Sequence, residues 1–116
     1  MNVRLKIVII HPDIKVRDVL RRNFEDNLGA EVLETLSSSE TFNLLEKNPD
    51  VSAIITLNEI GEDKVAGLLL NYLYDLNLKT PLIVIGEFEH TLKKYAIVSS
   101  VLKIEEINRL ILKSLN

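Results

Sequence analysis

The stretch VSAIITLNEIGED, residues 51–63, decides the fold of this chain. Its apolar first half stops at Thr56, and a polar loop with one glycine follows. Apolar residues return at helical spacing from Val65 onward. This order predicts a buried parallel strand, a loop and then a helix. In open α/β sheets, ligands and chemistry collect at the carboxyl ends of such strands. The residues that end this strand therefore carry the functional prediction.

Thr56, Leu57 and Asn58 occupy that position in this chain. They supply a hydroxyl and an amide, with no carboxylate, thiol or imidazole. No Gly-rich phosphate loop surrounds Gly61 or Gly67, so nucleotide or flavin binding is not expected. We predict no catalytic residue, no metal site and no cofactor, and hence a protein that is not an enzyme.

Strands and helices are expected to alternate along the whole chain. The expected strands are residues 5–10, 30–36, 51–55, 82–85 and 95–102, the last mainly in its second half. Residues 30–36 alternate apolar and polar, which predicts an edge strand with one face in water. Helices are expected from Asp13 to Gly29, from Ser37 to Asn48, from Val65 to about Lys79, and over residues 104–115. Right-handed crossovers then give a doubly wound parallel sheet of five strands in the order 2-1-3-4-5.

Three helix features are specific enough to be checked. Asp13 is expected to cap the first helix, and Ser37 with Glu40 fits a capping box at the second. The last helix is expected to pack through an apolar stripe consisting of Ile104, Ile107, Leu110, Ile111 and Leu115.

Composition limits the classes of function. A chain of 116 residues with 47% hydrophobic residues fits one globular domain. The net charge of −3 disfavours nucleic-acid binding. No apolar run approaches the roughly 20 residues that span a bilayer. The absence of cysteine excludes disulfides and thiolate metal sites, and a cytoplasmic location is expected.

This pattern resembles the receiver domain of two-component response regulators over essentially the whole chain. The family places an acidic pair after strand one, a phosphoacceptor Asp after strand three, a hydroxyl after strand four, and a Lys and an aromatic at strand five. The corresponding positions in this sequence are His11 and Pro12, Thr56, Gly86, Lys103 and Ser100. Only Lys103 keeps the family's residue type. In the loop, Asn58 matches the family's metal-binding carbonyl position and Asp63 its loop Asp.

The resemblance implies a degenerate member, a pseudo-receiver. Such a protein would signal without phosphorylation, through a protein partner or an output domain, with a homodimer as one form. Residues 1–116 would be a single domain, complete or the N-terminal part of a longer signalling protein. One alternative is a phospho-accepting regulator that uses Asp13 or Asp63. Another is a small flavodoxin-like ligand-binding domain or enzyme.

Several residues have two readings. For His11, one interpretation is a relic of the acidic site or a pH-sensitive switch; the other, which we favour, is a partly exposed polar residue. For Asp13, one interpretation is a metal ligand that replaces the missing acidic pair from a shifted position. The other, which we favour, is the cap of the first helix. Lys103 binds an anion or pairs with an acid of the facing loop, Glu59 or Glu62. His90 lacks a second metal ligand at suitable spacing and is expected to be solvated.

The connection between the fourth and fifth strands is too short for a full helix. Residues 87–94 offer at most two helical turns, so the fourth helix of the receiver frame is shortened or missing. We expect apolar surface of strands four and five to be exposed there, unless the connection folds over it. Exposed apolar surface marks interaction sites. The interface predicted here comprises Tyr95, Val101 and Leu112.

Overall fold

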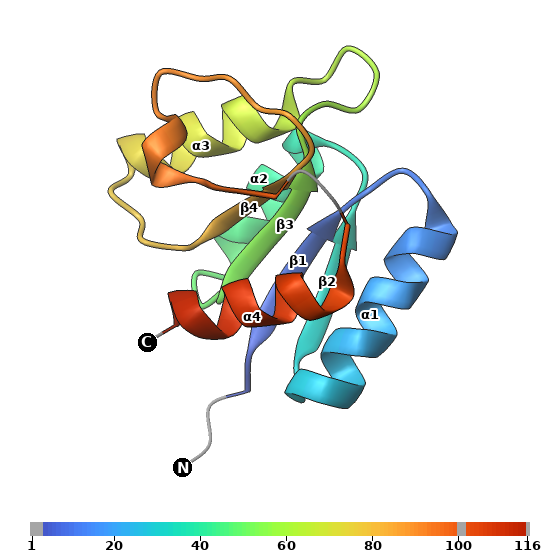
Figure 1. Ribbon diagram of the computed structural model, residues 1–116. Coiled ribbons are helices and arrows are strands. Elements are labelled where there is room, and N and C mark those ends of the chain that lie inside the picture. Colours follow the sequence, from blue (N-terminus) through green and yellow to red (C-terminus); the bar gives the residue numbers. More distant parts are fainter. Residues whose placement is uncertain (1–3, 100–101, 116) are drawn as a thin grey trace.

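The computed structural model describes residues 4–99 and 102–115. These residues form a parallel sheet between two layers of helices (Figure 1). The strands are β1 (Lys6–Ile10), β2 (Glu31–Thr35), β3 (Ala53–Leu57), β4 (Leu82–Ile85) and β5 (Ile97–Ser99). The helices are α1 (Ile14–Leu28), α2 (Ser38–Lys47), α3 (Val65–Asp75), α4 (Ile104–Ser114) and the 3-10 turn η1 (Lys93–Tyr95). The strand order β2-β1-β3-β4-β5 confirms the prediction.

Two apolar cores lie on opposite faces of the sheet. In β1, Ile7 and Ile9 pack under α1 and α4, whereas Val8 and Ile10 pack under α2 and α3. Because side chains alternate between the faces of a strand, a strand covered on both sides must be apolar at every position. This explains why the strand sequences KIVII and LIVI are nearly continuous apolar runs.

The predicted helix starts are confirmed in detail. Asp13 Oδ1 accepts the N–H of Lys15 at 2.8 Å, and Ser37 Oγ accepts the N–H of Glu40 at 3.1 Å. Glu40 reaches back as a capping box requires, but its Oε2 accepts the N–H of Leu36, one residue before the cap. None of the helices in the described part of the chain is long and apolar enough to cross a membrane.

Three predicted boundaries are wrong. Strand β3 begins and ends two residues later than the predicted 51–55, so Thr56 and Leu57 belong to the strand. Helix α3 ends at Asp75, because Asn77 takes a left-handed conformation (φ 55°) and the N–H of Leu78 bonds back to the carbonyl of Leu73. Its apolar pattern continues past this end, which misled the prediction. In the described residues, strand β5 covers Ile97–Ser99 and does not begin at the predicted residue 95, because η1 occupies the residues before it.

Two predicted faces are also wrong. In the edge strand β2, Val32 packs in one core and Leu33 in the other, so neither face of the strand is wholly in water. Leu115, which we placed on the core stripe of the last helix, caps the end of α4 and is exposed. The helix has ended there, so the helical spacing no longer applies.

The fourth helix is replaced by η1, as predicted for this connection. The prediction of exposed surface is wrong for β4, whose four residues are all buried. Phe88 from the connection is only 3% exposed and packs in the core with Leu92 and Ala96. On β5, Val98 is 36% exposed, so the uncovered surface lies on that strand.

Candidate functional site

The ends of β1, β3 and β4 bring three of the predicted positions to one edge of the sheet. Ile10 lies opposite Thr56, and Leu57 lies opposite Ile85. His11 and Gly86 directly follow these paired residues, so both lie beside Thr56 at the carboxyl end of the sheet. This is the edge at which an open α/β sheet places its ligands.

Thr56 lies at the centre of this edge, and its side chain is inaccessible to solvent. The residue is 1% exposed and has the same strand phase as Ile54, so it faces the layer of α2 and α3. Its Oγ1 donates to the carbonyl of Leu57 at 2.8 Å. The hydroxyl is therefore buried and hydrogen-bonded within its own strand.

The loop after β3 also uses its polar groups internally. The carbonyl of Asn58 accepts the N–H of Ala66 at 3.1 Å, which satisfies one of the free donors at the start of α3. Asp63 Oδ2 accepts the N–H of Ser38 at 2.9 Å and so caps the start of α2. Ile60 and Asp63 exchange two backbone hydrogen bonds of 3.0 Å each, with Gly61 in the left-handed region between them (φ 61°). The loop thus links the start of α2 to the start of α3 through hydrogen bonds.

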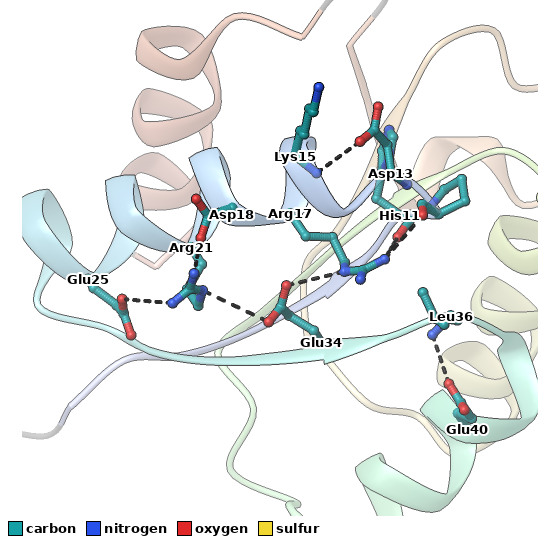
Figure 2. A network of polar contacts seen from close by, with 11 residues as sticks. His11, Asp13, Lys15, Arg17, Asp18, Arg21, Glu25, Glu34, Leu36 and Glu40 are labelled. Atoms are coloured by element: carbon teal, nitrogen blue, oxygen red, sulfur yellow. Dashed lines mark hydrogen bonds and ion pairs between the residues drawn. The ribbon is translucent and has the colours of Figure 1, made fainter.

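Arg17 places a positive charge at the end of β1 (Figure 2). Its Nη1 donates to the carbonyl of His11 at 2.7 Å and to that of Pro12 at 3.3 Å. Its Nε lies 3.3 Å from Glu34 Oε1 on β2. Sequence reasoning missed this residue, although Arg17 follows the capping Asp13 by one helical turn and can therefore reach back toward β1. The guanidinium repels any metal ion placed at this strand end.

The side chain of His11 takes part in the turn that follows β1. Its Nδ1 accepts the N–H of Asp13 at 3.0 Å, which requires that nitrogen to be unprotonated. Partial burial lowers the pKa of His11 below its ordinary value; the nearby Asp13 opposes this shift and Arg17 adds to it. The imidazole therefore helps to order the turn between β1 and α1.

Comparison with solved structures identifies the architecture. The receiver domain of the hybrid histidine kinase CckA matches with a TM-score of 0.78 at 18% identity, covering 96% of this chain and 99% of that domain. The Vibrio cholerae chemotaxis protein CheY4 matches with a TM-score of 0.77 at 16% identity, covering 97% of this chain and 100% of that one. A receiver domain from Clostridium thermocellum gives 0.76 at 18%, with coverages of 97% and 94%. This chain has the receiver fold.

At the sequence level the resemblance is weak. No protein-family model matches the chain, and no curated protein matches it by sequence. The chain thus shares the receiver fold at 18% sequence identity or less with the structures compared above.

Among the described residues, the remaining receiver positions make no hydrogen bond or ion pair with one another. Pro12 is exposed and has no side-chain donor, and Gly86 has φ 106°, a conformation that favours glycine. Lys103 is exposed at the start of α4 without a side-chain cap. In the described residues it forms no ion pair with Glu59 or Glu62, and Glu59 pairs with Lys64 instead. Ser100 and Val101 lie outside the described residues.

Metal-binding donors are likewise not brought together. Within residues 4–99 and 102–115, no group of three or more histidine and acidic side chains is placed to hold a metal ion. The receiver positions that would bear carboxylates hold an imidazole, a proline and a buried hydroxyl. Mg²⁺ prefers several oxygen ligands in octahedral geometry, which this set does not offer.

Proposed function

We propose that this chain is a pseudo-receiver, a signalling module that works by protein–protein contacts and without phosphorylation. It acts on a protein partner or on an output domain, and a homodimer is one form that it takes. The receiver fold supplies the class of module, and the closed strand ends supply the argument against phosphoryl transfer. A cytoplasmic location follows from this proposal.

The observation that carries the proposal is the engagement of Thr56 and Asn58. In the receiver frame these positions bear the phosphoacceptor and a metal-binding carbonyl. Here the Thr56 hydroxyl is buried against its own strand, and the Asn58 carbonyl bonds to α3. A threonine hydroxyl is also a far weaker nucleophile at neutral pH than a carboxylate is.

The alternative acceptors are committed to helix capping. Asp13 accepts the N–H of Lys15, and Asp63 accepts that of Ser38. Phosphorylation of either carboxylate would remove a cap worth about 1 kcal/mol. We therefore favour the phosphorylation-independent module.

The partner surface that we propose lies on β5 and α4. Leu112 on α4 is exposed, Val98 on β5 is partly exposed, and Tyr95 is exposed at the end of η1, two residues before β5. Val101 belongs to the predicted interface but lies outside the described residues. The structural neighbours include the receiver domain of a hybrid histidine kinase and that of an HD domain-containing protein, both of which work within larger chains.

A charge on α4 tests this surface. Leu112→Glu introduces a carboxylate at a residue that is 48% exposed, and Leu36→Glu, directly after β2, is the matched control at 50% exposure. We expect Leu112→Glu to weaken self-association or partner binding by at least about tenfold, because a buried interfacial charge is costly. Leu36→Glu should leave both unchanged in analytical ultracentrifugation and pull-down. Equal behaviour of the two variants would move the interface elsewhere.

Mg²⁺ titration tests the closed site separately. We expect binding no tighter than about millimolar at the strand ends, because the carboxylates are missing. The amide signals of residues 11, 56 and 58 in an NMR titration report this directly. A tight site at these residues would contradict the pseudo-receiver proposal.

A further inference from the structure

Three of the four strand connections lay a full helix on the sheet, and the connection from β4 to β5 does not. Parallel strands normally need such a crossover helix to cover the sheet. Near the carboxyl end of the sheet, Phe88 and Leu92 fill the place of the missing helix. His90 helps to hold this cover, since its ring stacks on Phe88 at 5.7 Å and lies over Gly67 of α3.

Toward the amino end of the sheet this cover stops, and a hollow of about 510 Å³ remains beside the C-terminal half of α3. We call it the α3–η1 hollow. Its apolar lining consists of Leu70, Leu73, Tyr74, Leu78, Pro81 and Tyr95. In Figure 1 the connection, coloured orange, comes down beside α3 and ends in η1 near the C-terminal end of that helix. The volume lies within the range of protein ligand pockets, roughly 300–1,000 Å³.

The lining of the hollow resembles a peptide-binding groove. Leu70 and Leu73 are buried and form its floor, whereas Tyr74, Leu78 and Tyr95 are exposed and form its walls. The rings of Tyr74 and Tyr95 pack at 5.3 Å and so join α3 to η1 across the hollow. Tyrosines are enriched among the residues that dominate binding energy at interfaces.

The charge around the hollow is positive. Lys79 lines it, and Lys94 has its Nζ 5.2 Å from the ring centre of Tyr95. None of the described lining residues is acidic. Lys93 is neutralised by Glu89 at 2.9 Å, but in the described part of the chain neither Lys79 nor Lys94 takes part in an ion pair. Two lysines are therefore available to an acidic occupant.

We propose that the α3–η1 hollow binds an acidic amphipathic helix of a partner protein, which takes the place of the missing crossover helix. A helix suits the position because the hollow lies in the helical layer, whereas a strand would add to an edge of the sheet. Apolar side chains at helical spacing would enter between Tyr74 and Leu78, and flanking acids would meet Lys79 and Lys94. This inference rests on the proposed function, because it gives a module that works by protein contacts a second binding surface, separate from the one proposed on β5 and α4.

A selection from displayed peptides tests the proposal. The library holds peptides of about four helical turns, with leucines fixed at helical spacing and all other positions randomised. Selection uses the wild-type chain, with soluble Tyr74→Glu as competitor. We expect the selected peptides to be rich in Asp and Glu. They should bind the wild type at least about tenfold more tightly than Tyr74→Glu, since a charge there blocks an aromatic contact.

Three further variants make the result specific. A double charge reversal, Lys79→Glu with Lys94→Glu, should also weaken binding of the acidic peptides by about tenfold. Leu68→Glu is the matched control on α3, because Leu68 is 43% exposed against 51% for Tyr74 but does not line the hollow. It should bind as the wild type does. Leu112→Glu should also leave peptide binding unchanged.

The contrary outcomes are distinct. Failure to select binders, selected peptides without acidic bias, or equal binding to Tyr74→Glu would overturn the proposal. NMR signals of the hollow that shift with protein concentration alone would assign it to a second copy of the chain and also overturn it. Loss of binding with Leu112→Glu but not Tyr74→Glu would refute the hollow and leave the proposed function intact. Phosphorylation of the chain would refute the proposed function without bearing on the hollow.

Discussion

The carboxyl end of the sheet and the α3–η1 hollow differ in how their side chains are used. At the strand ends, Thr56, Asn58 and Asp63 all bond within the chain, and Arg17 holds two carbonyls. At the hollow, Tyr74 and Leu78 remain exposed, and two lysines have no acidic partner in the described residues. The polar groups at the strand ends, where an α/β sheet usually places its ligands, stabilise the chain's own turns and helices. The face without a crossover helix still has exposed side chains that a partner could contact. The difference favours binding over catalysis.

The largest expected effect on the free energy of unfolding is a difference between Phe88, which covers the sheet, and Tyr95, which lines the hollow. Phe88→Ala should lower the free energy of unfolding by about 3–4 kcal/mol, because it empties a buried aromatic site. Tyr95→Ala, at an exposed site in the same connection, should cost under about 1 kcal/mol. Urea unfolding followed by circular dichroism measures both. Similar losses for the two variants would mean that the connection does not act as a core cover.

A carboxylate at position 56, the phosphoacceptor position of the receiver frame, should have the next largest effect on the free energy of unfolding. Thr56→Asp is expected to cost about 2 kcal/mol, because it buries a carboxylate where a small hydroxyl was satisfied. Thr56→Val, which nearly keeps the shape, should cost about 1 kcal/mol. Urea unfolding with and without Mg²⁺ gives the test. Stabilisation of Thr56→Asp by Mg²⁺ would show that a receiver-type metal site is still present.

A smaller effect is expected at the loop after β3. Asp63→Ala should cost about 1 kcal/mol, since it removes the cap on the N–H of Ser38. Glu62→Ala is the neighbouring control, and its exposed side chain should contribute less than about 0.5 kcal/mol. Thermal unfolding compares the two variants. Equal stability of both would argue against a structural role for the Asp63 carboxylate.

The smallest effect concerns His11 and has a definite sign. The pKa of His11 is lowered in the folded chain, so on acidification the unfolded chain binds this proton first. Its contribution to stability is complete above the unfolded pKa of about 6.5 and is lost as the pH falls through the folded pKa. His11→Asn should therefore lose less stability than the wild type on acidification from pH 7. An NMR titration midpoint of His11 above 6.5 would contradict this account.

Local signals in the sequence predicted most of the fold. The β-branched runs of β1 and β4, the caps at Asp13 and Ser37, and the turn at Gly29 each depend on neighbours in the chain, which is why they could be read from sequence. The closed state of Thr56 could not be predicted, because the strand phase that buries its hydroxyl depends on the register with β1 and β4.

Other features depend on contacts between distant residues. Phe88 lies in a connection without helical or strand periodicity, and its burial follows from the vacancy left by a helix. Leu78 continues the apolar pattern of α3, but after the left-handed Asn77 it lines the hollow instead of extending the helix. The hollow beside the C-terminal half of α3 was therefore not predicted from the sequence, which pointed to strands four and five instead.

Incubation with acetyl phosphate and Mg²⁺ tests the central claim most directly. Intact mass spectrometry detects a phosphoryl adduct, and amide NMR of residues 11, 13, 56, 58 and 63 locates any change. We predict no adduct and no shifts beyond those of a magnesium blank, because the hydroxyl, the carbonyl and both carboxylates are engaged within the chain. A stable adduct, with shifts centred on any of these residues, would contradict the proposal that this receiver fold signals without phosphorylation.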